Sequence, residues 1–167
     1  DGSTVAFTFR RESGSTESSA IWITGRNGKG ATRLLKSEGQ IRYGDPTFTP
    51  DGDLVVSFFR AISRQRANTG LLQVGADGTI EQRVYVKKMR WKKRRFDWAE
   101  VREPKFSPDG SKVLFALSAE SWSELFEDAY GTNLMILDLA SGKVRKVAEQ
   151  ALGGDWTGAL AMWAVPA

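Results

Sequence analysis

The sequence predicts an all-β protein built from about three four-stranded antiparallel sheets, each formed by one unit of a repeat. Two observations lead to this prediction. All five prolines lie in one recurring phrase that contains a tight turn. Between the copies of this phrase, apolar segments and glycine turns follow one another in the same order. Strands and turns that recur at a regular interval are typical of stacked sheet units.

The recurring phrase predicts a β-hairpin in each of its two full copies. It reads DPTFTPDGDLVVSF over residues 45–58 and EPKFSPDGSKVLFA over residues 103–116. In each copy Pro-Asp-Gly favours a tight turn, because proline fixes φ, aspartate bonds to nearby backbone and glycine accepts a positive φ. We therefore expect a short strand that ends at Phe48 or Phe106 and a longer apolar strand after the turn.

Two further strands are expected in each unit. Each long strand is followed by an apolar segment, a turn that contains glycine and a half-polar segment. The turns are at Asn27-Gly28, Asp77-Gly78 and Ser141-Gly142. A single sheet of this composition cannot bury both of its faces, so the units must stack on one another.

These motifs resemble the WD40-like β-propeller repeat of the TolB type, which also occurs in the N-terminal propellers of prolyl-oligopeptidase-like enzymes. The resemblance rests on the Phe-Ser/Thr-Pro-Asp-Gly turns and covers nearly the whole chain except two insertions. It implies propeller-like blades in which the strands ending at Phe48 and Phe106 lie nearest the axis. It also implies an exported, usually periplasmic, protein with a binding role. The repeat spacing exceeds the roughly 40–45 residues of compact blades, and we assign the excess to insertions at 87–102 and 119–131.

The chain ends carry half copies of the phrase. Residues 1–9 match its second half, and residues 162–167 match its first half with Trp163 one place out of step. We expect Met162–Val165 to supply the inner strand that the first unit lacks. Three arrangements remain open: part of a longer propeller, a ring completed by further copies, or an open stack whose edges another molecule covers.

The residue types present argue against catalysis. Histidine and cysteine are both absent, which excludes a Ser-His-Asp triad, a disulfide and a thiolate metal site. The acidic pairs Asp51 with Asp53 and Glu127 with Asp128 are expected in a turn and a loop. Gly25–Thr32 lacks the order of a phosphate-binding loop and is expected to be a hairpin turn. We therefore expect no catalytic residues, no metal and no cofactor.

A basic run is the first candidate interaction site. Seven of the 24 basic residues lie between Lys87 and Arg95, and the rest of the chain is slightly acidic. A protein partner or an anionic membrane surface is favoured, since arginine and tryptophan are common at binding hot spots and clustered cations bind anionic lipid. Nucleic acid is disfavoured, and a solvated strand edge is the alternative. The predicted site comprises Lys87, Lys88, Arg90, Trp91, Lys92, Lys93, Arg94, Arg95, Phe96 and Trp98.

The acidic insertion at 119–131 is the second candidate. Trp122, Leu125 and Phe126 are spaced as on one face of a helix, which predicts a short amphipathic helix. This helix would either cap a blade or bind a partner, and its acidic residues could pair with the basic run.

The resulting prediction is a single domain, residues 1–167, that acts as a non-catalytic scaffold. We expect an accessory subunit of a larger, membrane-associated periplasmic complex, with protein subunits as its partners. Because Asp1 begins within the phrase, we also expect an upstream segment that could hold an export signal or an anchor. The alternative is the N-terminal gating propeller of a prolyl-oligopeptidase-like hydrolase.

Overall fold

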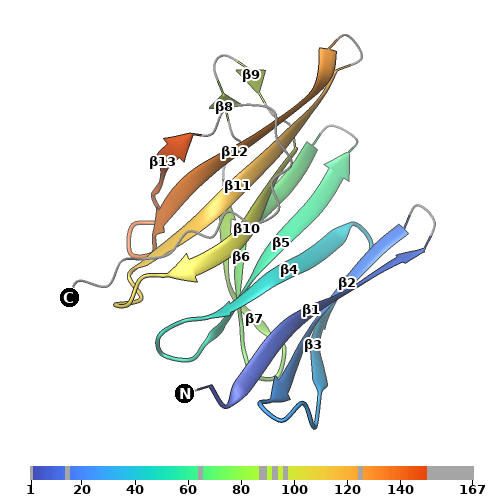
Figure 1. Ribbon diagram of the computed structural model, residues 1–167, viewed down its shortest axis with the longest axis vertical. Coiled ribbons are helices and arrows are strands. Elements are labelled where there is room, and N and C mark those ends of the chain that lie inside the picture. The colour runs from blue at the N-terminus through green and yellow to red at the C-terminus, as the bar shows by residue number, and fades with distance from the viewer. Residues whose placement is uncertain are drawn as a thin grey trace.

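A computed structural model describes residues 2–13, 16–63, 66–86, 90–91, 94–95, 98–123 and 126–149. Within these ranges the chain forms β-strands joined by turns, without a helix. The strands build three antiparallel sheets and one small hairpin (Figure 1). The expected all-β fold class with about three sheets is confirmed. The first sheet has three strands among the described residues, and the fourth strand was expected from Met162–Val165, outside them.

Each sheet is a meander in which strands that follow one another in the chain are paired. The first sheet contains β1 (Thr4–Ser13), β2 (Thr16–Gly25) and β3 (Thr32–Lys36). The second contains β4 (Ile41–Phe48), β5 (Leu54–Ser63), β6 (Arg66–Val74) and β7 (Ile80–Val86). The third contains β10 (Trp98–Phe106), β11 (Lys112–Ser123), β12 (Phe126–Asp138) and β13 (Val144–Glu149). We call β4 and β10, the first strands of the four-stranded sheets, the inner strands.

The two proline turns close hairpins as expected, but they differ in length by one residue. Thr49 donates its backbone N–H to the carbonyl of Asp53 at 2.8 Å, whereas Ser107 donates to the carbonyl of Lys112 at 2.9 Å. Phe48 therefore pairs with Leu54, whereas Phe106 pairs with Val113, which stands one place later in the phrase. Because side chains alternate between the two faces of a strand, this difference exchanges the faces of equivalent sequence positions.

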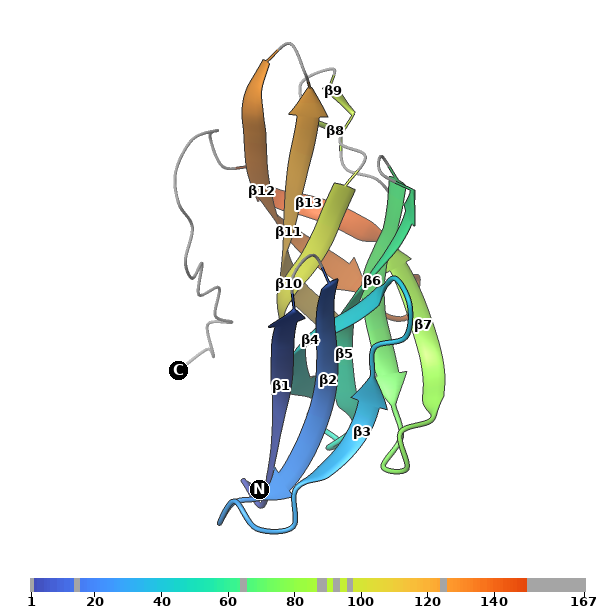
Figure 2. The same cartoon turned by 90° about the vertical axis from the view of Figure 1, so that its right-hand side faces the viewer.

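The three sheets stack in chain order, with the first sheet at one end of the molecule and the third at the other (Figure 1, Figure 2). Strand β4 packs on β1 and β2, and β10 packs on β4, β5 and β6. We call the surface of a sheet that points toward the preceding sheet its N-side face, and the opposite surface its C-side face. In the first sheet, which has no sheet before it, the N-side face is the surface that points away from the second sheet. The N-side face carries Leu54, Val56 and Phe58 in the second sheet, and Val113, Phe115 and Leu117 in the third.

Two hydrophobic cores fill the two spaces between sheets. Ile21 of the first sheet packs with the N-side face of the second. Val55 and Leu71, on the C-side face of the second sheet, pack with the N-side face of the third. Burial of these apolar side chains is the main force that holds the stack together.

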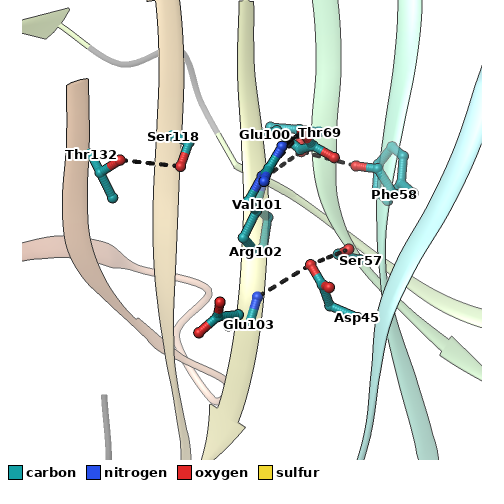
Figure 3. Close-up of polar contacts among 10 residues, drawn as sticks. All are labelled: Asp45, Ser57, Phe58, Thr69, Glu100, Val101, Arg102, Glu103, Ser118 and Thr132. Atoms are coloured by element: carbon teal, nitrogen blue, oxygen red, sulfur yellow. Dashed lines mark hydrogen bonds and ion pairs between the residues drawn. The ribbon is translucent and has the colours of Figure 1, made fainter. Parts of the chain in front are cut away.

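A buried hydroxyl group also joins each pair of sheets. Ser19 Oγ accepts a hydrogen bond from the backbone N–H of Tyr43 on the inner strand β4 at 2.7 Å. Thr69 Oγ1 accepts one from the backbone N–H of Val101 on the inner strand β10 at 3.0 Å (Figure 3). In both cases a side chain on the C-side face of one sheet holds the inner strand of the next.

The predicted amphipathic helix in the acidic insertion is wrong. Strands β11 and β12 continue through this segment as one long hairpin, in which Glu120 pairs with Tyr130 and Ser123 with Phe126. Trp122 lies near the end of β11 and Phe126 begins β12, while Leu125 lies outside the described residues. Cross-strand pairing overrides the weak local preference for a helix, as tertiary context often does.

The remaining expectations about chain organisation differ in their outcome. The glycine turns after β2, β6 and β12 are present, with positive φ at Gly28, Gly78 and Gly142. Residues 98–102, expected to belong to the first insertion, form the start of the inner strand β10. The expected strand at Met162–Val165 lies outside the described residues.

Candidate functional site

The basic run forms a small hairpin in the part that the structure describes. Arg90 pairs with Arg95 and Trp91 with Arg94, as strands β8 (Arg90–Trp91) and β9 (Arg94–Arg95). In both views this hairpin lies at the same end of the molecule as the tip of β11 and β12 (Figure 1, Figure 2). The other predicted residues of the run, apart from Trp98 at the start of β10, are Lys87, Lys88, Lys92, Lys93 and Phe96, and they lie outside the described residues.

The structure brings four residues of the predicted basic site into one hairpin, namely Arg90, Trp91, Arg94 and Arg95. It describes their backbone pairing and not the contacts of their side chains. The same holds for the side chains of Trp122, Leu125 and Phe126 in the second candidate. Binding of a partner or a membrane surface by either segment therefore stays a prediction.

A second surface emerges on the N-side face of the first sheet, which the sequence did not single out. Val5, Phe7 and Phe9 project from this face of β1 and are 46%, 38% and 57% exposed. Strand β1 is also an edge of its sheet: among the described strands it pairs with β2 alone, so its other edge is unpaired. An apolar face beside an unpaired strand edge is a typical protein-binding surface. Apolar side chains at alternate positions were the available signal in the sequence.

The inner strands carry an unusual acidic motif that the sequence also contained. Asp45 and Glu103 have positive φ, at 44° and 50°, and they are the two non-glycine residues with this conformation in the described ranges. Each precedes a proline, a position that normally disfavours such a backbone, and each lies at a β-bulge. The acid before proline in both copies of the phrase was the signal for this feature.

The two acidic bulges contact each other. One carboxylate oxygen of Asp45 accepts hydrogen bonds from the backbone N–H of Glu103 at 3.3 Å and from the hydroxyl of Ser57 at 3.5 Å (Figure 3). The acid on one inner strand thereby holds the backbone of the next. This arrangement explains why the strained conformation is kept at Asp45, because the carboxylate is aimed at the neighbouring sheet.

An arginine lies beside these acids. Arg102 pairs with Glu100 at 2.8 Å on the same strand. Burial opposes the charged guanidinium, but attraction to Glu100, Asp45 and Glu103 outweighs this effect and raises the pKa of Arg102. The cation stays charged at every physiological pH and balances the acidic bulges, which leaves a compact polar network along the inner strands.

Aspartates in the turns are ionised more readily than usual. Hydrogen bonds from the hydroxyl of Ser107 and from the backbone and hydroxyl of Ser111 lower the pKa of Asp109 to about 2. Bonds from Thr79 lower the pKa of Asp77, and bonds from Ser141 lower that of Asp138. These carboxylates stabilise turns and accept no proton near neutral pH, so they are structural groups.

The described residues were also compared with the requirements of a metal site and of a membrane-spanning helix. No group of three or more metal-ligating acidic side chains comes together among the residues that the structure describes. The same part of the chain contains no helix with the length and hydropathy required to cross a membrane.

Comparison with known proteins gives matches among solved structures. The sequence matches no protein-family model and no curated protein. TolB from Acinetobacter baumannii is similar with a TM-score of 0.47 and 21% identity, over 78% of this chain and 26% of that chain. A puromycin-hydrolyzing peptidase of Mycobacterium tuberculosis is similar with a TM-score of 0.47 and 14% identity, over 88% of this chain and 24% of the peptidase. The chain thus spans about a quarter of the length of these proteins.

Proposed function

We propose that this chain is a non-catalytic interaction scaffold that serves as an accessory subunit of a larger, membrane-associated periplasmic complex. The observation that carries the proposal is the exposed apolar face of Val5, Phe7 and Phe9 beside the unpaired edge of β1. Water contact with this much apolar surface is unfavourable, and a protein partner would remove it.

The basic run provides the second contact in this proposal. Its seven cations and neighbouring aromatic residues suit an acidic protein surface or anionic lipid headgroups. The absence of histidine from the chain supports a role in binding, because the most common general base is not available.

Native mass spectrometry of the tagged chain from detergent-extracted envelopes of its source cells tests the proposal. The expected result is a complex that contains one copy together with unrelated subunits. The double variant Arg94→Glu with Arg95→Glu should reduce recovery of that complex about tenfold. The control variant Arg26→Glu with Lys29→Glu changes two exposed cations in the β2–β3 turn and should leave recovery unchanged.

Three results would contradict the proposal in different ways. Recovery of the wild-type chain only as multiples of 18.5 kDa would remove the role as an accessory subunit. Unchanged recovery of the Arg94 and Arg95 variant would remove the basic run from the docking surface. Binding of the wild-type chain to phosphatidylglycerol vesicles, without any protein complex, would replace the protein partner by the lipid surface.

A further inference from the structure

The first sheet has no inner strand among the described residues, although both four-stranded sheets begin with one. Thr8 of β1 pairs with Ile21 on β2. Ser57 of β5 has the same place in the second sheet, where it pairs with Leu71 on β6. Strand β1 therefore corresponds to β5, and its unpaired edge corresponds to the edge of β5 on which β4 lies. Such an edge can accept an extended chain as an added strand.

In the second sheet, this place brings together a carboxylate, a hydroxyl and a cation. The carboxylate of Asp45 on β4 accepts hydrogen bonds from the hydroxyl of Ser57 and from the backbone N–H of Glu103 (Figure 3). Arg102, on the next inner strand, is attracted by the charge of Asp45. The inner strand of a complete sheet thus supplies an acid to a hydroxyl group and a guanidinium.

In the first sheet, the hydroxyl and the cation are present without a described acid. The hydroxyl of Thr8 is buried and has no hydrogen-bond partner in the described part of the chain. Gly44 of β4 corresponds to Arg102 of β10, because each follows the residue whose N–H the preceding sheet holds. The guanidinium of Arg10 lies beside Gly44, with one nitrogen 3.1 Å from the position that a Cβ atom would have there. Among the side chains that the structure describes, no carboxylate forms an ion pair with Arg10.

A carboxylate would satisfy both of these groups. It accepts hydrogen bonds from a hydroxyl, and its charge is opposite to that of a guanidinium. The N-side face beside this edge has the same sign of charge as Arg10. Arg11, Arg33 and Lys36 are exposed on it, and the described side chains of that face include no acid. The charges around β1 therefore favour an acidic partner.

The inner strands of the chain show what else an added strand should carry. In both, the acid is followed by proline and preceded, two positions earlier, by a buried residue, Tyr43 or Val101. Tyr43 pairs with Phe58, and Phe9 has the place of Phe58 in the first sheet. A large apolar residue two positions before the acid would therefore cover part of Phe9, which is 57% exposed.

We propose that the unpaired edge of β1 binds an extended segment of a partner protein through an aspartate or glutamate whose carboxylate lies between Thr8 and Arg10. The inference rests on the proposed function, because it specifies how the partner of the scaffold is recognised. The segment runs antiparallel to β1, as β4 does to β5 and β10 to β11. An outside strand suits this edge better than the end of the same chain, since residues 158–167 contain no aspartate or glutamate.

A synthetic peptide with the sequence of β4, Ile41–Phe48, is the probe, because it carries the large residue, the acid and the proline in the required order. Fluorescence anisotropy of the labelled peptide should show saturable binding to the purified full-length chain. The same peptide with Asp45→Asn keeps its shape and loses its charge, so it should bind about tenfold more weakly.

Two variants of the protein test the groups that receive the carboxylate. Thr8→Val and Arg10→Gln should each weaken binding of the acidic peptide about fivefold and reduce its advantage over the asparagine peptide. Thr8→Val replaces an unsatisfied hydroxyl by a methyl group, so its melting temperature should be no lower than that of the wild type. The control Arg26→Gln removes an exposed cation of the β2–β3 turn and should leave peptide binding unchanged.

Hydrogen–deuterium exchange locates the bound peptide. The backbone amides of β1 should exchange more slowly with the acidic peptide present, because an added strand pairs with this edge. The amides of β13, the last strand of the third sheet, should exchange as they do without the peptide.

The inference fails on any of three results. A lack of saturable binding up to millimolar peptide would mean that the edge of β1 does not accept a strand of this kind. Equal affinity for the aspartate and asparagine peptides would show that Thr8 and Arg10 do not recognise a carboxylate. Slower exchange at another sheet edge, or faster exchange in β4, would mean that the peptide binds elsewhere or displaces β4.

The complex recovered from cell envelopes separates this inference from the proposed function. Unchanged recovery of the complex with Thr8→Val and with Arg10→Gln would retain the scaffold role and overturn strand recognition at β1. Recovery of the wild-type chain without any partner, together with selective binding of the acidic peptide, would overturn the scaffold role and support recognition of an acidic strand.

Discussion

The hydroxyl of Thr69 connects two sheets by taking part in two buried hydrogen bonds. It accepts the backbone N–H of Val101 at 3.0 Å and donates to the carbonyl of Phe58 at 2.9 Å. Its replacement by valine keeps the shape of the side chain but leaves both backbone groups without this partner. We expect Thr69→Val to lower the free energy of unfolding by about 2 kcal/mol, measured by urea denaturation.

The variant Thr69→Ser is the matched control for this prediction. Serine keeps the hydroxyl and removes one methyl group, so the loss should be about 1 kcal/mol or less. Equal losses for the valine and serine variants would mean that packing, and not the hydrogen bonds, holds the inner strand at this point.

Asp45 combines a strained backbone with a contact to the next sheet. Asparagine tolerates positive φ and keeps a side-chain oxygen that can accept the N–H of Glu103, so Asp45→Asn should cost less than about 1 kcal/mol. Valine is unfavourable at φ 44° and has no acceptor, so Asp45→Val should cost roughly 3 kcal/mol. Urea denaturation of both variants would check the difference, and similar losses would rule out the role assigned to the carboxylate.

The hairpins and turns were predictable from the sequence because their causes are local. Proline, aspartate and glycine each restrict or permit a particular backbone conformation, so the turn before Leu54 could be located within a residue. The faces of the strands could not be deduced from the repeat alone. The turn before Val113 is one residue longer, and a shift of one residue moves every side chain to the opposite face.

The failed helix prediction has a related cause. Trp122, Leu125 and Phe126 have helical spacing, but the chain on both sides is already paired from Lys112 to Asp138. Extension of an existing hairpin adds cross-strand contacts without a new nucleation step, so it prevails over weak local preference. The exposed face of Val5, Phe7 and Phe9 depends on which sheets are neighbours, and only the stacking of the sheets makes this visible.

Gly70 allows close contact between β6 and β7. A Cβ atom at this position would collide with the carbonyl oxygen of Val84 and would lie 3.0 Å from the ring of Phe58. Because backbone on the neighbouring strand cannot move without breaking the ladder, Gly70→Ala should cost roughly 3 kcal/mol. Gly39→Ala is the comparison: it has open space but positive φ, and should cost about 1 kcal/mol. Thermal melting of both would test this, and a smaller loss at Gly70 would contradict the predicted clash.

The carboxylate of Asp109, which accepts hydrogen bonds within its turn, should make the free energy of unfolding depend on pH. Its pKa is lowered to about 2 in the folded chain by bonds from Ser107 and Ser111, compared with 3.8 for the free group. A lowered folded-state pKa gives stabilisation that is present above about pH 4 and is lost as the pH falls toward 2. Urea denaturation from pH 6 to pH 2 should therefore show a shallower acid decline for Asp109→Asn than for wild type.

The matching residue in the other proline turn provides the control. Asp51 occupies the same place in the phrase, but none of the described residues donates a hydrogen bond to its carboxylate, and the hydroxyl of Thr49 accepts the backbone N–H of Asp53. Asp51→Asn therefore removes one negative charge from the chain without breaking a turn hydrogen bond of the kind that Asp109 accepts from Ser111, and it is the charge-matched control for Asp109→Asn. If Asp51→Asn and Asp109→Asn flatten the decline equally, the effect belongs to the net charge of the chain and not to the serine bonds around Asp109.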